Sequence, residues 1–167
     1  MIPPDVDLDA LAADLKEDSV AVGALGQEYP DLEGYLHEVV QEAAENGRGD
    51  YAFVVLDKMP EMPADMRDIA QELLHRTDAD TVVLRTPQYG TIVSSEHSRA
   101  EIEAAELVIF QDNDYVASFR WLTETLGQQP VAWGWVHVLL LVVVVAAVVF
   151  AALSFRSVKS QELTPAR

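Results

Sequence analysis

The chain contains no cysteine and few basic residues, and both absences narrow what it can be. Without thiols it forms no disulfide bond and uses no cysteine nucleophile. Lysine and arginine number 11 against 28 aspartate and glutamate residues, which leaves a formal net charge of −17. An acidic surface repels nucleic acid, so a basic protein or bound cations would suit it better as partners. Solubility alone is the simpler explanation of the charge.

The sequence also lacks the common signatures of catalysis. The four histidines show no metal-ligand spacing, and there is no glycine-rich phosphate loop, nucleophile elbow or zincin motif. Asp57 follows a predicted strand, which is the position of phosphoacceptor aspartates, but the second aspartate of haloacid-dehalogenase-type phosphatases is missing. We therefore expect no catalytic residue, no metal and no cofactor.

What the chain does have is one long hydrophobic segment near its end. Residues 131–153 form an uncharged run rich in leucine and valine, and about 20 such residues suffice for a helix to span a bilayer. Trp133 and Trp135 at its start are typical of the membrane interface, and Arg156 and Lys159 follow it. By the positive-inside rule, these cations predict a cytoplasmic tail and an N-terminal domain outside the cell.

These features predict three parts of the chain. They are an extracytoplasmic domain over residues 1–129, a transmembrane helix over 130–154 and a cytoplasmic tail over 155–167. Residues 1–20 hold neither a basic nor a hydrophobic leader region, so no cleavable signal peptide is expected. A tail-anchored protein with a cytoplasmic domain would have a similar sequence, and this alternative stays open.

Hydrophobic periodicity predicts an α/β fold for the N-terminal domain. Helices are expected over residues 8–15, 31–46, 65–76, 98–106 and 115–126, and strands over 19–22, 51–56, 81–84 and 91–93. The run 51–56 is nearly all apolar, as in a strand covered on both faces. With the helix and strand that follow, it predicts a right-handed crossover and a small open, mostly parallel sheet with flanking helices.

The last predicted helix indicates which edge of the sheet is free to bind a partner. Because only residues 128–130 separate it from the hydrophobic segment, its C-terminal end should lie near the membrane. If the crossover helices run the same way, the carboxyl ends of the strands face outward, and ligands usually bind at that edge. Residues 58–63 and 86–90 and a helical insertion over 94–107 are expected there.

Several core segments resemble a known family. Residues 51–57 (YAFVVLD), 66–70 (MRDIA), 81–84 (TVVL) and 89–91 (YGT), followed by one C-terminal span, are similar to small single-pass membrane proteins of mycobacteria and corynebacteria. That resemblance implies a TPM-like outer domain with receiver-like topology. It also implies association with peptidoglycan endopeptidases of the NlpC type that are RipA-like.

The resemblance implies a non-enzymatic regulator that binds a secreted peptidoglycan hydrolase and relieves its autoinhibition during cell separation at the septum. The lipid bilayer and other divisome membrane proteins would be further partners. The implied contact is a membrane-distal helical insertion, which here corresponds to residues 94–107. It contains the predicted partner-binding residues Ser95, His97, Arg99, Glu101 and Glu103. Two rival functions stay open: a TPM-like phosphatase that uses Asp57, and a tail-anchored cytoplasmic scaffold.

Overall fold

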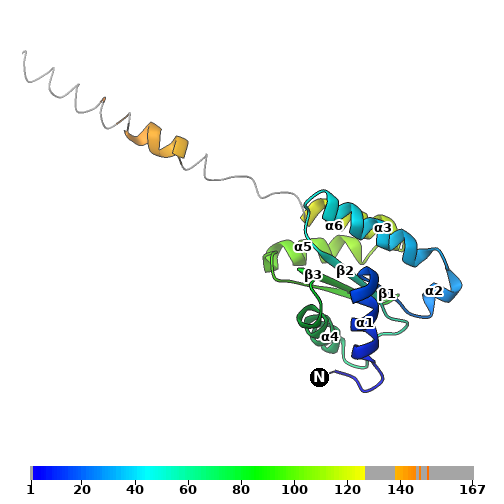
Figure 1. Cartoon of the computed structure of the whole chain (residues 1–167). Helices are drawn as coiled ribbons and strands as arrows, with labels where there is room; N and C mark the ends of the chain where they lie inside the picture. Colours follow the sequence, from blue (N-terminus) through cyan, green and yellow to red (C-terminus); the bar gives the residue numbers. More distant parts are fainter. Residues whose placement is uncertain (1, 127–137, 146, 148–149, 151–167) are drawn as a thin grey trace, which may run out of the picture. The chain divides into compact units, whose positions relative to one another are not determined.

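The structure of the chain is a computed structural model, and it describes residues 2–126, 138–145, 147 and 150 (Figure 1). The chain divides into two compact units, Met1–Gln128 and Gln129–Arg167. In the second unit, residues 138–145 are helical. Among the described residues, no helix is both long and apolar enough to cross a membrane. Much of the expected span lies outside them, together with Trp133, Trp135, Arg156 and Lys159.

Helices and strands alternate through the first unit, as the periodicity predicts. The elements are α1 (Leu8–Asp18), β1 (Val20–Val22), α2 (Leu25–Glu28), α3 (Leu32–Glu45), β2 (Tyr51–Val55), α4 (Pro63–Arg76), β3 (Thr81–Arg85), β4 (Gly90–Ser94), α5 (Arg99–Ile109) and α6 (Tyr115–Leu126). Only α2 was not predicted. A helix of about one turn is too short to show a hydrophobic period.

Capping residues set the ends of several helices. The side chain of Asp7 accepts hydrogen bonds from two backbone N–H groups in the first turn of α1, at 3.1 and 3.0 Å. Ser98 and Glu101 form a capping box at the start of α5. After α3, Gly47 has a φ of 64°, a left-handed conformation that favours glycine. Each of these signals is local, so the sequence alone reveals it.

The strands form one open sheet in the order β1-β2-β3-β4. β1, β2 and β3 are parallel, and β4 is antiparallel to β3. The prediction of a small, mostly parallel sheet with flanking helices is thus confirmed. β4 runs backward because residues 86–89 form a short connection, whereas a parallel neighbour needs a crossover of a dozen or more residues.

Helices cover both faces of the sheet (Figure 1). A hydrophobic core lies between the sheet and the helices on each face. On one face, α3, α5 and α6 pack over Phe53, Val83 and Ile92. On the other face, α1 and α4 pack over Val54 and Val82. Successive residues of β2 therefore enter opposite cores, which explains why that strand is apolar throughout.

The strand order gives the two crossover connections opposite hands. β1, β2 and β3 lie side by side in chain order, yet α3 covers one face and α4 covers the other. Two right-handed crossovers in the same direction would place both helices on one face. One of the two is therefore left-handed. Receiver-like sheets have the strand order 2-1-3-4-5. The order of this sheet is different, so the receiver-like topology implied by the resemblance does not hold for its strand order.

A buried arginine joins the end of β3 to the connection between α5 and α6. Arg85 is 2% exposed. Its guanidinium donates hydrogen bonds to the Ile109 carbonyl oxygen and to Ser118 Oγ, both at 3.1 Å, and to the Asp112 carbonyl oxygen. It lies 4.2 Å from the centre of the Tyr115 ring. Burial lowers the pKa of Arg85. These contacts fix the end of α5 at the carboxyl edge of the sheet.

Candidate functional site

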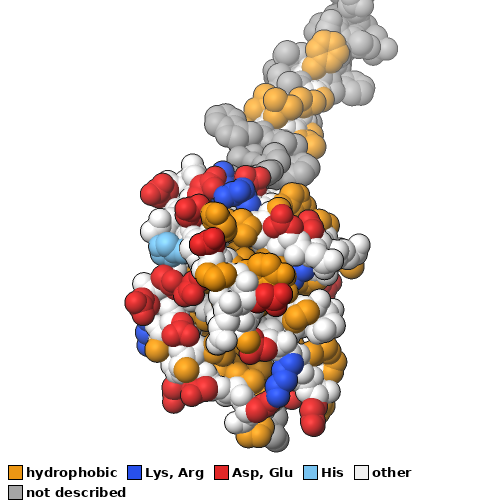
Figure 2. All heavy atoms as spheres, turned by 90° about the vertical axis from the view of Figure 1, so that its right-hand side faces the viewer, with side chains coloured by type: hydrophobic (Ala, Val, Ile, Leu, Met, Phe, Trp, Pro, Cys, Tyr) orange, Lys and Arg blue, Asp and Glu red, His pale blue; other side chains and the backbone are white. Residues whose placement is uncertain are grey.

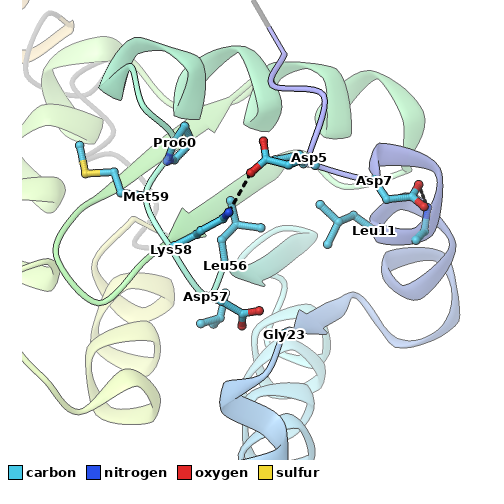
Figure 3. Close-up of a pocket in the computed structure, with 12 residues that line it drawn as sticks. Asp5, Asp7, Leu11, Gly23, Leu56, Asp57, Lys58, Met59 and Pro60 are labelled. Carbon is cyan, nitrogen blue, oxygen red and sulfur yellow. Dashed lines mark hydrogen bonds and ion pairs between the residues drawn. The ribbon is translucent and has the colours of Figure 1, made fainter.

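A pocket of about 250 Å³ opens between the carboxyl ends of β1 and β2 (Figure 3). The chain leaves β1 toward one face of the sheet and β2 toward the other, and such divergence creates a crevice in α/β sheets. The loop after β2 lines one side of the pocket, and the segment before α1 lines the other. This is the carboxyl edge at which the sequence predicts residues 58–63.

Asp57, which follows β2, contacts the residues that follow β1 and so connects the ends of the two strands. Its side chain accepts a hydrogen bond from the backbone N–H of Ala24. It also lies directly against Gly23, where an added Cβ would come 2.3 Å from Asp57 Oδ1 (Figure 3). Any side chain at position 23 would therefore require the Asp57 carboxylate to move. Asp57 thus has a structural contact with the end of β1.

Lys58 and Asp5 meet at the mouth of the same pocket. Lys58 Nζ lies 3.1 Å from Asp5 Oδ2 (Figure 3). The hydrogen bond from Lys58 lowers the pKa of Asp5. Both side chains are well exposed, so solvent screens the pair and it contributes little to stability. Within the part of the chain that the structure describes, no group of three or more acidic or histidine side chains could hold a metal ion.

Three of the predicted partner-binding residues line a second cleft, of about 400 Å³, between α4, the edge strand β4 and α5. We call it the α4–α5 cleft; its lining includes His97, Arg99 and Glu103. Arg99 Nε lies 2.6 Å from Glu103 Oε1, one helical turn further on, and this hydrogen bond raises the pKa of Arg99. Glu101 is engaged instead in the capping box, where its carboxylate accepts the Ser98 backbone N–H at 2.8 Å.

The structure corrects the predicted location of the first residues of the insertion. Ser95 donates its backbone N–H to the Asp80 carbonyl oxygen at 2.9 Å, just before β3 begins. His97 Nε2 lies 3.5 Å from the hydroxyl of Tyr51, the first residue of β2, whose pKa burial raises to about 12. Ser95 and His97 thus lie at the amino edge, because β4 reverses the chain. Only the end of α5 reaches the carboxyl edge.

Glu106 also lines the α4–α5 cleft, although the sequence did not predict it as a site residue. Its Oε1 accepts the backbone N–H of Ile92 at 2.8 Å and the hydroxyl of Thr91 at 3.3 Å. β4 is the last strand of the described sheet, so one of its sides has no neighbouring strand. The carboxylate therefore covers part of an edge that would otherwise be open to another strand. No sequence pattern links two residues whose contact depends on the placement of α5.

Two hydrophobic side chains on α5 were also missed. Leu107 is 69% exposed and Val108 is 48% exposed. They lie off the buried side of the helix, which carries Ala105 and Ile109. The solvent-facing side of a helix is usually polar. Two apolar residues at such positions could therefore have been noticed in the sequence.

Comparison with known proteins identifies the family. A family model described as "Membrane protein Rv1476" matches residues 1–164. A relative named "Membrane protein Rv1476", from Mycobacterium tuberculosis (strain ATCC 25618 / H37Rv), is 32% identical over 154 residues, which cover 91% of this chain and 77% of the relative. No solved structure matches the chain. The mycobacterial membrane-protein part of the resemblance is confirmed, and the chain belongs to the Rv1476 family of membrane proteins.

Proposed function

We propose that this protein is a non-enzymatic, membrane-anchored regulator of a secreted peptidoglycan hydrolase. Its α/β domain would lie outside the cell and bind a RipA-like endopeptidase of the NlpC type during septal cell separation. Membership of a membrane-protein family supports the anchor. The acidic composition supports a protein partner with a basic surface and not nucleic acid.

The observation that carries the proposal is the α4–α5 cleft. It brings the predicted residues His97, Arg99 and Glu103 together beside an edge strand, and the charged side chains of Arg99 and Glu103 are well exposed. Charged groups placed in this way give an interface its specificity and rate of association. The guanidinium of Arg85, by contrast, donates its hydrogen bonds to groups inside the domain.

Activation would work through differential binding. The hydrolase exchanges between a blocked and an open form, and a protein that binds the open form more tightly shifts the population toward it. A coupling of about 1–3 kcal/mol, the usual range, changes that equilibrium roughly 5- to 150-fold. The domain needs no reactive group for this effect.

The test removes the charged pair on α5. In a variant with Arg99→Ala and Glu103→Ala, we expect activation of the hydrolase to fall about tenfold while the melting temperature stays the same, because both side chains are largely exposed. The measurement is the rate of peptidoglycan cleavage by the purified hydrolase with the full-length protein added.

A matched control removes an equivalent pair elsewhere. Glu72 and Arg76 form an i, i+4 pair on α4, with 2.8 Å between Arg76 Nε and Glu72 Oε1, and they do not line the cleft. The double alanine variant at those positions should activate the hydrolase fully. Arg76 also binds Asp9, so the melting temperature of this variant is measured as well. Equal activation by both variants would count against the cleft as the binding surface.

The phosphatase rival rests on the position of Asp57 at the end of β2, beside the pocket at the carboxyl edge. It requires that the protein hydrolyse a phosphate ester and that Asp57→Asn abolish this turnover. For a non-enzymatic regulator, we expect no turnover by the natural protein or by the variant. Because Asp57 contacts Ala24 and Gly23, the stability of the variant must be measured beside its activity.

A further inference from the structure

A third cleft lies at the carboxyl edge, on the face covered by α3 and α6. We call it the tyrosine groove; it holds about 710 Å³ between α2, the start of α3 and the start of α6. It shares no lining residue with the pocket of Figure 3 or with the α4–α5 cleft. On the face that carries α2, hydrophobic side chains gather among acidic ones (Figure 2).

Three aromatic rings distinguish this groove from the rest of the surface. Tyr29 is 56% exposed and Tyr35 is 53% exposed, and Tyr115 lines the groove beside them. Leu25 and Leu32 add apolar surface. Tyrosine rings supply large contact areas at little cost in conformational entropy, and they are enriched where proteins bind other proteins. Two rings that are more than half exposed on one groove are therefore available to a partner.

The charged residues of the groove are all acidic. Glu28, Asp31 and Asp114 line it, and no lysine or arginine does. Asp114 also accepts the backbone N–H of Ala117 at 2.9 Å, which holds its carboxylate at the start of α6. Carboxylates beside aromatic faces select a cation, because both attract positive charge. The chemistry of the groove is thus complementary to lysine or arginine.

One contact between a cation and a tyrosine ring already exists inside the domain. The guanidinium of Arg85 lies 4.2 Å from the centre of the Tyr115 ring. A second cation on the solvent side would meet Tyr29 and Tyr35 in the same manner. Anionic ligands, including nucleic acid and acidic lipid headgroups, would meet three carboxylates instead.

We propose that the tyrosine groove binds an extended segment of a partner protein that carries lysine or arginine side chains. Its cations lie against the rings of Tyr29 and Tyr35, between the carboxylates of Glu28, Asp31 and Asp114. Extended segments bind to aromatic-lined grooves elsewhere because little conformational entropy is lost. This proposal does not depend on the hydrolase, since the groove and the α4–α5 cleft are separate surfaces.

The test uses the full-length protein in neutral detergent micelles and a fluorescent nine-residue peptide that repeats alanine, proline and lysine. We expect this peptide to bind, with an affinity that falls as salt is raised. Replacing every lysine by glutamate should abolish binding, and replacing it by alanine should weaken binding at least about tenfold. No binding of the lysine peptide, or equal binding of the alanine version, would overturn the proposal.

Variants locate the site. Tyr29→Ala with Tyr35→Ala should weaken binding of the lysine peptide about tenfold or more, and both side chains are exposed enough for the domain to stay folded. Tyr89→Ala is the control, because Tyr89 is 45% exposed and lines the α4–α5 cleft and not the groove. Equal loss in the control, or no loss in the double variant, would contradict the assignment. Circular dichroism verifies that each variant is folded.

Discussion

At the scale of single residues, Arg85 carries the most consequential interactions of the domain. Its guanidinium is buried, and its hydrogen-bond acceptors are the carbonyl oxygens of Ile109 and Asp112 and the hydroxyl of Ser118. The carbonyl end of a helix carries partial negative charge, so the end of α5 is a favourable place for a cation. The Tyr115 ring, against which the guanidinium also lies, contributes to the tyrosine groove.

We predict that Arg85→Ala destabilises the protein by about 3 kcal/mol or more, because it leaves a cavity and buried carbonyl groups without a donor. Arg85→Lys should also be destabilising, since one ammonium group cannot reproduce the planar fork of donors. Urea unfolding of the full-length protein measures both changes. A loss below about 1 kcal/mol for the alanine variant would show that the contacts of Arg85 matter little.

At the scale of elements, local signals predicted the helices and strands well. Asp7, Ser98 and Gly47 mark helix ends by contacts within a few residues of the chain, so no tertiary information was needed. The direction of β4 was not predicted, although the short connection over residues 86–89 excludes a parallel crossover. That missed reversal explains why Ser95 and His97 were expected at the wrong edge.

The candidate sites were predicted less completely than the elements. Arg99 and Glu103 are separated by one helical turn, so their pairing could be expected from the sequence. The hydrogen bond from Ile92 to Glu106 depends on how α5 packs beside β4. The tyrosine groove joins α2 and α3 to α6, which lies about 80 positions later in the sequence. Such contacts depend on tertiary packing, which periodicity does not specify.

Glu106 leads to a prediction about the edge of the sheet. In Glu106→Ala, the N–H of Ile92 loses its acceptor, so we expect its hydrogen exchange to become faster and the protein to self-associate more readily. Glu106→Gln keeps an acceptor oxygen and should behave like the natural protein. Exchange measured by mass spectrometry on peptides covering residues 90–94 distinguishes them. Identical exchange in all three proteins would contradict the role given to Glu106.

At the scale of the whole molecule, α6 connects the two edges of the α/β domain. Arg120 Nε lies 3.5 Å from Glu42 Oε2 near the end of α3, and Leu126 shares a core with Tyr51. α6 therefore runs from the carboxyl edge to the amino edge of the domain. The hydrophobic segment follows its end. The tyrosine groove lies at the edge where α6 begins, and Ser95 and His97 lie at the edge where α6 ends.

If this acidic domain works outside the cell, a reagent that does not cross the membrane must reach it, and labelling of a single thiol measures that access. Gln88 is exposed in the connection between β3 and β4, and the chain has no cysteine of its own, so Gln88→Cys provides a single reactive thiol. A membrane-impermeant maleimide is applied to intact cells and to lysed cells. We predict full labelling in intact cells. Labelling only after lysis would place the domain in the cytoplasm and overturn the proposed function.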